Sequence, residues 1–241
     1  MATLTDIHSH ILPGLDDGAK DMDTSVEMMR IAYENGIRDI ILTPHFKPNH
    51  HNASATTINN RIEELRERCI AEGIKIRLYK GNELMYYSGV IEALEEGRAN
   101  TLAGSKYVLI EFNPMDSYER IRDGLYEALS HGYRPILAHV ERYESVIKEL
   151  DRVSELINMG CYMQVNAGSI TGNFGRTTKK NVKNLLKNEM VHFVASDAHD
   201  TENRSPALLE SFRYVIRKYG KRYERKLYKE NPKAVIKNEP I

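Results

Sequence analysis

The feature that most constrains the fold of this chain is a repeated alternation between two kinds of apolar segment. Stretches with an apolar residue every three or four positions, typical of amphipathic helices, are followed by short and almost continuous apolar runs, typical of buried strands. The pattern predicts six helices that are each followed by a strand, and a seventh helix near the end. These helices are expected at residues 23–35, 56–72, 88–96, 118–132, 150–160, 177–188 and 206–219.

Strands that alternate with helices favour a parallel sheet covered by helices. An eightfold barrel of this kind typically takes ~250 residues, and seven strands in 241 residues therefore predict a smaller, seven-unit barrel. An open, doubly wound sheet is the alternative. The chain is expected to form one domain over residues 1–241. The polar stretch 221–241 is predicted to add an outer helix, followed by a tail from about residue 231.

Composition excludes several classes of protein. The 34 Lys and Arg residues are balanced by 34 Asp and Glu residues, whereas a dedicated nucleic-acid binder carries excess positive charge. No apolar stretch is long enough to span a bilayer, and the polar start of the chain does not resemble a secretory signal. Two distant cysteines, Cys69 and Cys161, form no disulfide framework, so we expect a reducing, cytoplasmic setting.

Metal-binding residue types follow nearly every predicted strand. They are His8, His10, His45, Glu83, Glu111, His139, Asp197 and His199. In a parallel barrel the carboxyl ends of all strands lie on one face, so these distant residues are expected to meet. A single histidine of this kind is more often a core or surface residue, but eight residues at the same place in successive units indicate a functional cluster.

Imidazole and carboxylate groups without a thiolate suit Zn, Mn or Fe better than Cu(I). Asp17 follows the first strand in an Asp-Asp-Gly motif, which by itself is equally typical of a turn. A single catalytic ion takes about three protein ligands, so nine candidates, with Asp17 included, predict two or three ions. The other four histidines are left out as solvent-exposed or wrongly placed: His50, His51, His131 and His192.

Sites with several metal ions typically stabilise the attacking and leaving oxygens in a displacement on phosphorus. Arg142 follows His139 by three residues, and Arg204 follows His199 by five. A guanidinium group matches phosphate oxygens with two parallel hydrogen bonds, so both arginines are candidate phosphate ligands. The alternative is that they only orient the metal ligands.

Cysteine-based phosphatase chemistry is excluded by the residues that follow the two cysteines. That mechanism needs an arginine six residues after the cysteine, and the residues there are Lys75 after Cys69 and Ala167 after Cys161. Both cysteines also fall in apolar positions, where a buried thiol is usually inert.

The motifs D-I-H-S-H, D-D-G, T-P-H, G-N-E, L-I-E-F, A-H-x-E-R and A-S-D-x-H occur in this order. The set resembles the PHP (polymerase and histidinol phosphatase) superfamily, and most closely its manganese-dependent bacterial protein-tyrosine phosphatases of the CpsB/YwqE type. The resemblance extends over almost the whole chain. It implies a distorted (β/α)7 barrel, similar to a TIM barrel, with three metal ions.

The resemblance also implies a role for each site residue. The first ion would be held by His8, His10, Glu83 and Asp197, the second by Glu83, Glu111 and His139, and the third by Asp17, His45 and His199. Arg142 and Arg204 would bind the phosphate, and His199, His45 or a metal-bound water would assist the leaving group.

The implied activity is hydrolysis of phosphotyrosine by a metal-bridged hydroxide, with Mn²⁺ as cofactor and Fe, Co, Zn or Mg as alternatives. The implied partner is the phosphotyrosine tail of a bacterial tyrosine kinase that regulates capsule or exopolysaccharide synthesis, with no nucleic acid and no membrane insertion. The ring of the substrate could stack on Phe46, Tyr86 or Tyr87, but these aromatic side chains are equally typical of packing in the core or at the rim of the barrel.

Three other functions fit part of the pattern. A small-molecule phosphatase, such as a histidinol-phosphate phosphatase, would use the same scaffold and metals. A nuclease or a proofreading module would also use several ions, but it predicts a basic groove that the balanced charge does not support. A non-catalytic module that binds a kinase tail is disfavoured by the intact set of ligands and arginines.

Overall fold

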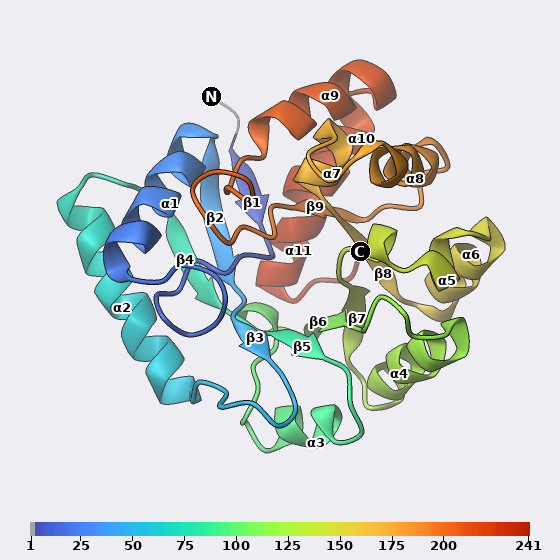
Figure 1. Cartoon of the computed structure of the whole chain (residues 1–241), viewed down its shortest axis with the longest axis horizontal. Coiled ribbons are helices and arrows are strands. Elements are labelled where there is room, and N and C mark those ends of the chain that lie inside the picture. Colours follow the sequence, from blue (N-terminus) through green and yellow to red (C-terminus); the bar gives the residue numbers. More distant parts are fainter. Residues whose placement is uncertain (1–2) are drawn as a thin grey trace.

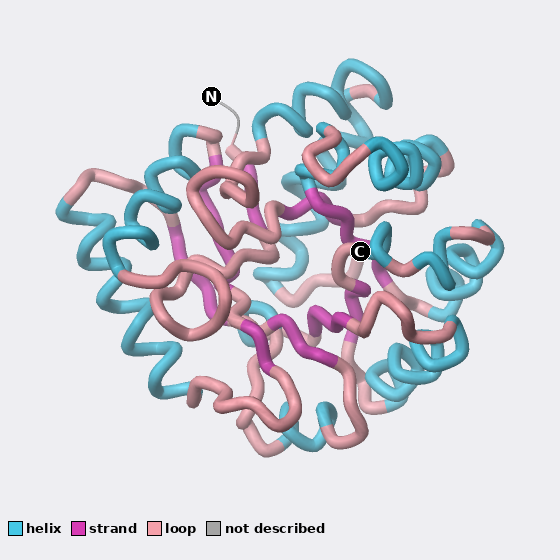
Figure 2. Tube along the Cα trace, viewed as in Figure 1, coloured by secondary structure: helices cyan, strands magenta, loops and turns pink. Residues whose placement is uncertain are grey.

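The parallel strands follow one another around the middle of the molecule, with the helices outside them (Figures 1 and 2). The computed structural model describes residues 3–241. Its strands are β1 (Leu4–Asp6), β2 (Ile37–Leu42), β3 (His45–Phe46), β4 (Arg77–Lys80), β5 (Glu83–Met85), β6 (Tyr107–Glu111), β7 (Arg134–Leu137), β8 (Tyr162–Asn166) and β9 (Phe193–Ala195).

These strands occupy seven positions, because β2 and β3 are pieces of one interrupted strand and so are β4 and β5. All pairs are parallel, in the orders β1-β2-β4 and β3-β5-β6-β7-β8-β9. Beyond β1 and β9, a parallel bridge joins Ser9 to Ala198, and the His10 amide donates to the Ala198 carbonyl at 2.8 Å. The last strand position therefore meets the first. The predicted seven-unit barrel is confirmed, and the open-sheet alternative is wrong.

The predicted helices form with small shifts at their ends. They are α1 (Met22–Glu34), α2 (Ala55–Ala71), α3 (Val90–Glu95), α4 (Tyr118–Ser130), α6 (Leu150–Met159), α8 (Arg176–Lys187) and α9 (Leu209–Tyr219). Side chains of Asp21, Ser54 and Ser117 cap α1, α2 and α4 by accepting from a backbone amide three residues later. Two short helices, α5 (Glu144–Ile147) and α7 (Ala167–Thr171), were not expected. None of the helices within residues 3–241 has the length and apolar character needed to span a membrane.

The C-terminal segment closes the amino end of the barrel, so the expected outer tail from about residue 231 is wrong. It forms α10 (Lys221–Arg225), a π-helical turn η3 (Lys226–Glu230) and α11 (Asn231–Lys237). Val235 is fully buried and packs with apolar residues of the barrel interior. The Lys106 amide, just before β6, donates to Asn238 Oδ1 at 2.9 Å. Few residues of this segment are apolar, but those few fill the end of the barrel and leave the carboxyl ends of the strands for the site.

Candidate metal centre

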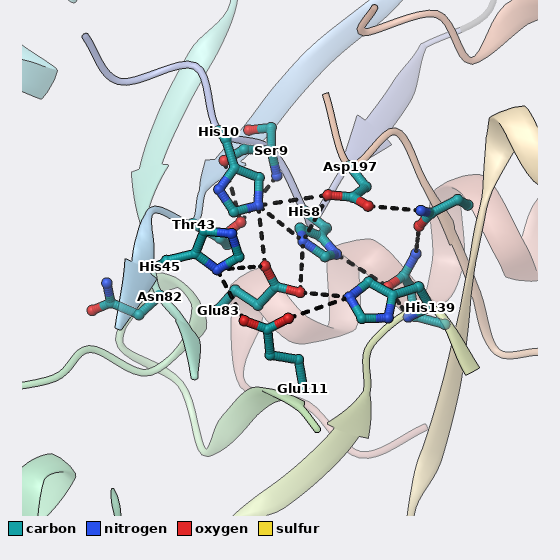
Figure 3. A network of polar contacts seen from close by, with 12 residues as sticks. His8, Ser9, His10, Thr43, His45, Asn82, Glu83, Glu111, His139 and Asp197 are labelled. Atoms are coloured by element: carbon teal, nitrogen blue, oxygen red, sulfur yellow. Dashed lines mark hydrogen bonds and ion pairs between the residues drawn. The ribbon is translucent and has the colours of Figure 1, made fainter. Parts of the chain in front are cut away.

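All nine predicted metal ligands lie close together at the carboxyl ends of the strands, and Figure 3 shows most of them. They form three overlapping groups, in each of which the ligand atoms lie within 4.8 Å of one another. The groups are His8, His10, Glu83 and Asp197; His45, Glu83 and Glu111; and His10, Asp17, His45 and His199. His139 lies beside the second group, with Nε2 2.8 Å from Glu83 Oε1 and 3.7 Å from Glu111 Oε2. This cluster is capable of holding metal ions.

Two of these residues have a left-handed backbone that is rare for residues other than glycine. His139 has a φ of 32° and Asp197 a φ of 52°. Each follows a buried strand, β7 or β9. Such a conformation costs on the order of 1–3 kcal/mol and persists only where the surrounding structure imposes it. The sharp turns allow both side chains to reach the shared cluster.

The tautomer of His8 follows from the hydrogen bonds of Gln164. The His139 amide, which can only donate, lies 2.8 Å from Gln164 Oε1, so this atom is the amide oxygen. His8 Nδ1 lies 3.1 Å from the same oxygen and must therefore carry a proton. His8 Nε2 is then free to act as a ligand.

His10 is oriented in the same way by Asp16, whose Oδ2 lies 2.7 Å from His10 Nδ1. The Nε2 atoms of His8 and His10 lie only 3.2 Å apart. With both Nδ1 atoms hydrogen-bonded to oxygens, the two Nε2 atoms can approach this closely only with a positive charge between them, either a proton or a metal ion. The residues present therefore fit a metal ion.

A second indication of a cation comes from two buried atoms beside β3 and β6. His45 Nδ1 and Glu111 Oε1 lie 3.0 Å apart, but neither has a hydrogen-bond partner of acceptable geometry within residues 3–241. Glu83 Oε2 lies 3.1 Å from the same nitrogen. Buried polar atoms without partners are costly, and an ion bound by these three side chains would satisfy them.

Asp197 connects the cluster to the two predicted phosphate ligands. Its Oδ1 faces the cluster, 3.4 Å from His8 Nε2. Its Oδ2 accepts hydrogen bonds from Asn166 Nδ2 (2.7 Å) and Arg142 Nη2 (2.7 Å). The same oxygen forms an ion pair with Arg204 Nη2 at 2.9 Å. Both arginines thus lie at the edge of the cluster and orient one of its members.

The carboxylates of the cluster stabilise protonated histidines. Burial alone lowers the pKa of His10, but hydrogen bonds and charge interactions with Asp16 and Glu83 outweigh it and raise that pKa to about 9. Burial likewise opposes protonation of His45, whose pKa is nevertheless raised to about 12 by Asp17, Glu111 and Glu83. A metal ion would replace these protons as the positive charge in the cluster, so its binding is coupled to proton release.

Sequence reasoning missed three residues that orient the cluster: Asp16, Gln164 and Asn166. Gln164 Nε2 donates to Asn166 Oδ1 at 2.8 Å, so a buried chain of side chains links His8 to Asp197. The sequence did contain a signal for two of them. Gln164 and Asn166 lie at the end of the one predicted strand that supplies no ligand, and they have the same two-residue spacing as His8 and His10.

The predicted aromatic stacking surface is not formed by Phe46 or Tyr86. Phe46 is buried in the hydrophobic core. Tyr86 packs on Phe112, with ring centroids 5.0 Å apart, and its hydroxyl donates to Glu127 at 2.8 Å. Tyr87 is partly buried against the same core.

Comparison with known proteins gives one consistent answer. Residues 4–237 match the family model described as "Capsular polysaccharide synthesis, CpsB/CapC". The chain is 33% identical over 243 residues to the tyrosine-protein phosphatase CpsB of Streptococcus agalactiae serotype III, and the match covers 99% of this chain and 100% of that protein. It is 34% identical to the tyrosine-protein phosphatase YwqE of Bacillus subtilis, over 99% of this chain and 93% of that protein.

A solved structure supports the same relationship. It comes from a study of YwqE from Bacillus subtilis and CpsB from Streptococcus pneumoniae, described as unique metal-dependent tyrosine phosphatases. The TM-score is 0.93 at 32% sequence identity, and the match covers 99% of this chain and 96% of that one.

Proposed function

The chain belongs to the CpsB/CapC capsular polysaccharide synthesis family, and we propose that it acts there as a metal-dependent protein-tyrosine phosphatase. The full-length relationship to tyrosine phosphatases of metal-dependent type carries this conclusion. The cysteines agree with it. Cys69 and Cys161 are both buried, and burial raises their thiol pKa values to about 11 and about 12. Neither thiol is suited to act as a nucleophile at neutral pH.

We assign the nine side chains of the cluster to two or three divalent ions. The first ion would use His8, His10, Glu83 and Asp197, the second Glu83, Glu111 and His139, and the third Asp17, His45 and His199. The other four histidines, His50, His51, His131 and His192, are not assigned to an ion. Bound divalent ions supply Lewis-acid polarisation of the phosphoryl group and acidify water at neutral pH. The nitrogen and oxygen donor set supports Mn²⁺, and it also accepts Fe, Co, Zn or Mg.

The two arginines are assigned to the phosphoryl oxygens of the substrate. Their side chains are partly exposed, 35% for Arg142 and 27% for Arg204, so a phosphate group can reach both. On binding, the guanidinium groups would exchange Asp197 Oδ2 for phosphate oxygens, where they stabilise the developing charge. Asn166 would remain on Asp197 and keep Oδ1 directed at the cluster.

Release of the tyrosyl group needs little help from a general acid, because a phenol has a pKa of about 10. With only two ions bound, His199 and His45 remain free of metal and are the proposed proton donors for this step. His199 Nδ1 lies 3.0 Å from the Asp197 carbonyl oxygen, which leaves Nε2 on the side of Asp17.

The proposed substrate is phosphotyrosine in the flexible tail of a bacterial tyrosine kinase that regulates capsule or exopolysaccharide synthesis, in the cytoplasm. The capsule-synthesis family and the phosphatase names of the relatives support this choice.

The test compares hydrolysis of a phosphotyrosine peptide with hydrolysis of histidinol phosphate after metal removal and after addition of Mn²⁺. We expect metal-dependent turnover of the peptide and little turnover of histidinol phosphate. The reverse preference would favour the small-molecule phosphatase, and absence of turnover of either compound would favour a binding module.

A further inference from the structure

A cleft of about 450 Å³ opens directly beside the third group of metal-binding residues. Its inner wall is formed by members or neighbours of that group, Asp16, Asp17 and His45. Its outer wall is formed by Lys47, His50 and His51, which belong to the loop between β3 and α2. A substrate bound at the metals through its phosphate would therefore have this cleft next to it.

The outer wall is a loop that the protein holds in one shape. The Lys47 amide donates to Asn52 Oδ1 at 2.8 Å, and Asn52 Nδ2 donates to the Lys47 carbonyl at 2.8 Å. The Asn52 amide also donates to the His50 carbonyl at 3.0 Å, and Asn49 takes a left-handed conformation with a φ of 60°. A loop that is already ordered by its own hydrogen bonds loses little conformational freedom when a ligand binds.

The acidic side chains of the inner wall already have partners within the protein, whereas the basic side chains of the outer wall do not. Asp16 accepts from His10 and from the His45 amide, and Asp17 lies 3.2 Å from His45 Nε2, so the inner carboxylates already have cationic or donor partners. The side chains of Lys47, His50 and His51 have no hydrogen-bond or ion-pair partner in the part of the chain that the structure describes. The cleft thus offers an unused ammonium group and two imidazoles to an incoming ligand.

From this arrangement we infer that the cleft is a subsite for an anionic side chain that flanks the phosphotyrosine of the substrate. The inference rests on the proposed phosphatase function and specifies which phosphotyrosine sequences it prefers. An extended peptide advances by about 3.3–3.6 Å per residue, so a residue close to the phosphotyrosine can reach the loop. The ligand chemistry is a carboxylate, from Asp or Glu, or the phosphate of a second phosphotyrosine.

Three phosphotyrosine peptides that differ only in one flanking residue test the subsite. The flanking residue is Gln in the first peptide, Glu in the second and a second phosphotyrosine in the third. A solvent-accessible charge pair contributes about 0.2–1 kcal/mol, which corresponds to roughly 1.4- to 5-fold. Two such contacts therefore predict a kcat/KM that is about 2- to 25-fold higher for the anionic peptides. The preference should appear mainly in KM and should decrease at high salt. The Glu and phosphotyrosine arms separate the two sources of the anion.

The deciding comparison uses the Lys47→Ala variant and the His50→Ala, His51→Ala double variant. In each, the ratio of kcat/KM for the anionic peptide to that for the Gln peptide should fall toward one. The His131→Ala variant, which removes an exposed histidine elsewhere, should keep the wild-type ratio. Rates on p-nitrophenyl phosphate, which has no flanking residue, correct for differences in the amount of active enzyme.

Equal rates on all three peptides, or a preference that survives in both loop variants, would overturn the subsite and leave the phosphatase function intact. Loss of bound metal from the double variant would overturn it in favour of a ligand role for these histidines. Turnover of p-nitrophenyl phosphate without turnover of any peptide would refute the proposed function together with the subsite.

Discussion

Replacement of Asn166 by Ala is the substitution that best separates orientation of the metal centre from direct metal binding. Asn166 is fully buried and touches no proposed ion. Its side chain donates to Asp197 Oδ2 at 2.7 Å and accepts from Gln164 Nε2 at 2.8 Å. The Asn166→Ala variant therefore removes one of the two hydrogen-bond donors of Asp197 Oδ2 and leaves a buried donor of Gln164 without a partner.

Two effects of different size are expected. Loss of a residue that orients a metal ligand typically lowers metal affinity by about 10- to 100-fold, or about 1.4–2.8 kcal/mol. A buried donor without a partner costs about 1–3 kcal/mol of folding stability. For a chain of this size, each kcal/mol lowers the Tm by about 2–4 °C. The metal-free variant should therefore melt several degrees below the metal-free wild type.

Metal affinity is measured by competition with a chelator of known affinity, and thermal unfolding is followed with and without Mn²⁺. The Ser211→Ala variant is the matched control, because Ser211 is also fully buried and its loss leaves the buried Tyr228 hydroxyl, which donates to Ser211 Oγ at 2.9 Å, without this partner. The control should lose stability without losing metal affinity. If Asn166→Ala behaves in the same way, the proposed link between Asn166 and the metal centre is refuted.

Four further predictions follow from the site. The Arg204→Ala variant should keep its metal content, because two other donors still hold the Asp197 carboxylate with which Arg204 pairs. Its kcat should fall by roughly two orders of magnitude, and a wild-type rate would show that Arg204 does not act in the site. Neighbouring carboxylates raise the pKa of His10 to about 9 and that of His45 to about 12, so both rings are protonated in the metal-free protein below pH 9 and an ion must displace these protons. Metal affinity should therefore fall as the pH is lowered from 9 to 6, with proton release visible by calorimetry in buffers of different ionisation enthalpy, and a constant affinity over this range would contradict the argument. Burial raises the thiol pKa values of Cys69 and Cys161 to about 11 and about 12, so treatment with iodoacetamide near neutral pH should leave the activity unchanged, whereas inactivation in step with alkylation would point to a cysteine mechanism. Single-turnover hydrolysis in isotopically labelled water should place solvent oxygen directly in the released phosphate, and a trapped phosphoenzyme would exclude this route.

The barrel and the ligand candidates were predictable from the sequence for the same physical reason. In a parallel barrel, residues at the carboxyl ends of successive strands share one face, so His8, Glu111, His139 and Asp197 could be grouped before their positions were known. The structure brings these residues together, and the resemblance to a phosphatase family is confirmed by the full-length relatives.

The residues that orient the ligands could not be found by a search for metal-binding types. Gln164 and Asn166 carry amides, and their role depends on which atom faces which neighbour. The ion pairs of Arg142 and Arg204 with Asp197 also depend on side-chain conformations that the spacing of motifs does not specify.

The C-terminal segment failed as a prediction because its composition is dominated by polar residues. A helix that closes the end of a barrel needs to bury only a few side chains there, such as Val235, and these are too few to reveal an amphipathic pattern. The short interruption between β2 and β3 falls at Thr43 and Pro44, and a proline cannot donate to a strand ladder, so the sequence did carry a signal for it.

The central claim is that side chains from the first strand to the last surround several cations at one end of the barrel. Anomalous X-ray diffraction from crystals grown with Mn²⁺ tests it most directly. We expect two or three anomalous peaks, one of them enclosed by His8, His10, Glu83 and Asp197. Crystals saturated with Mn²⁺ that show no peak among these residues, or a peak only elsewhere on the protein, would contradict it.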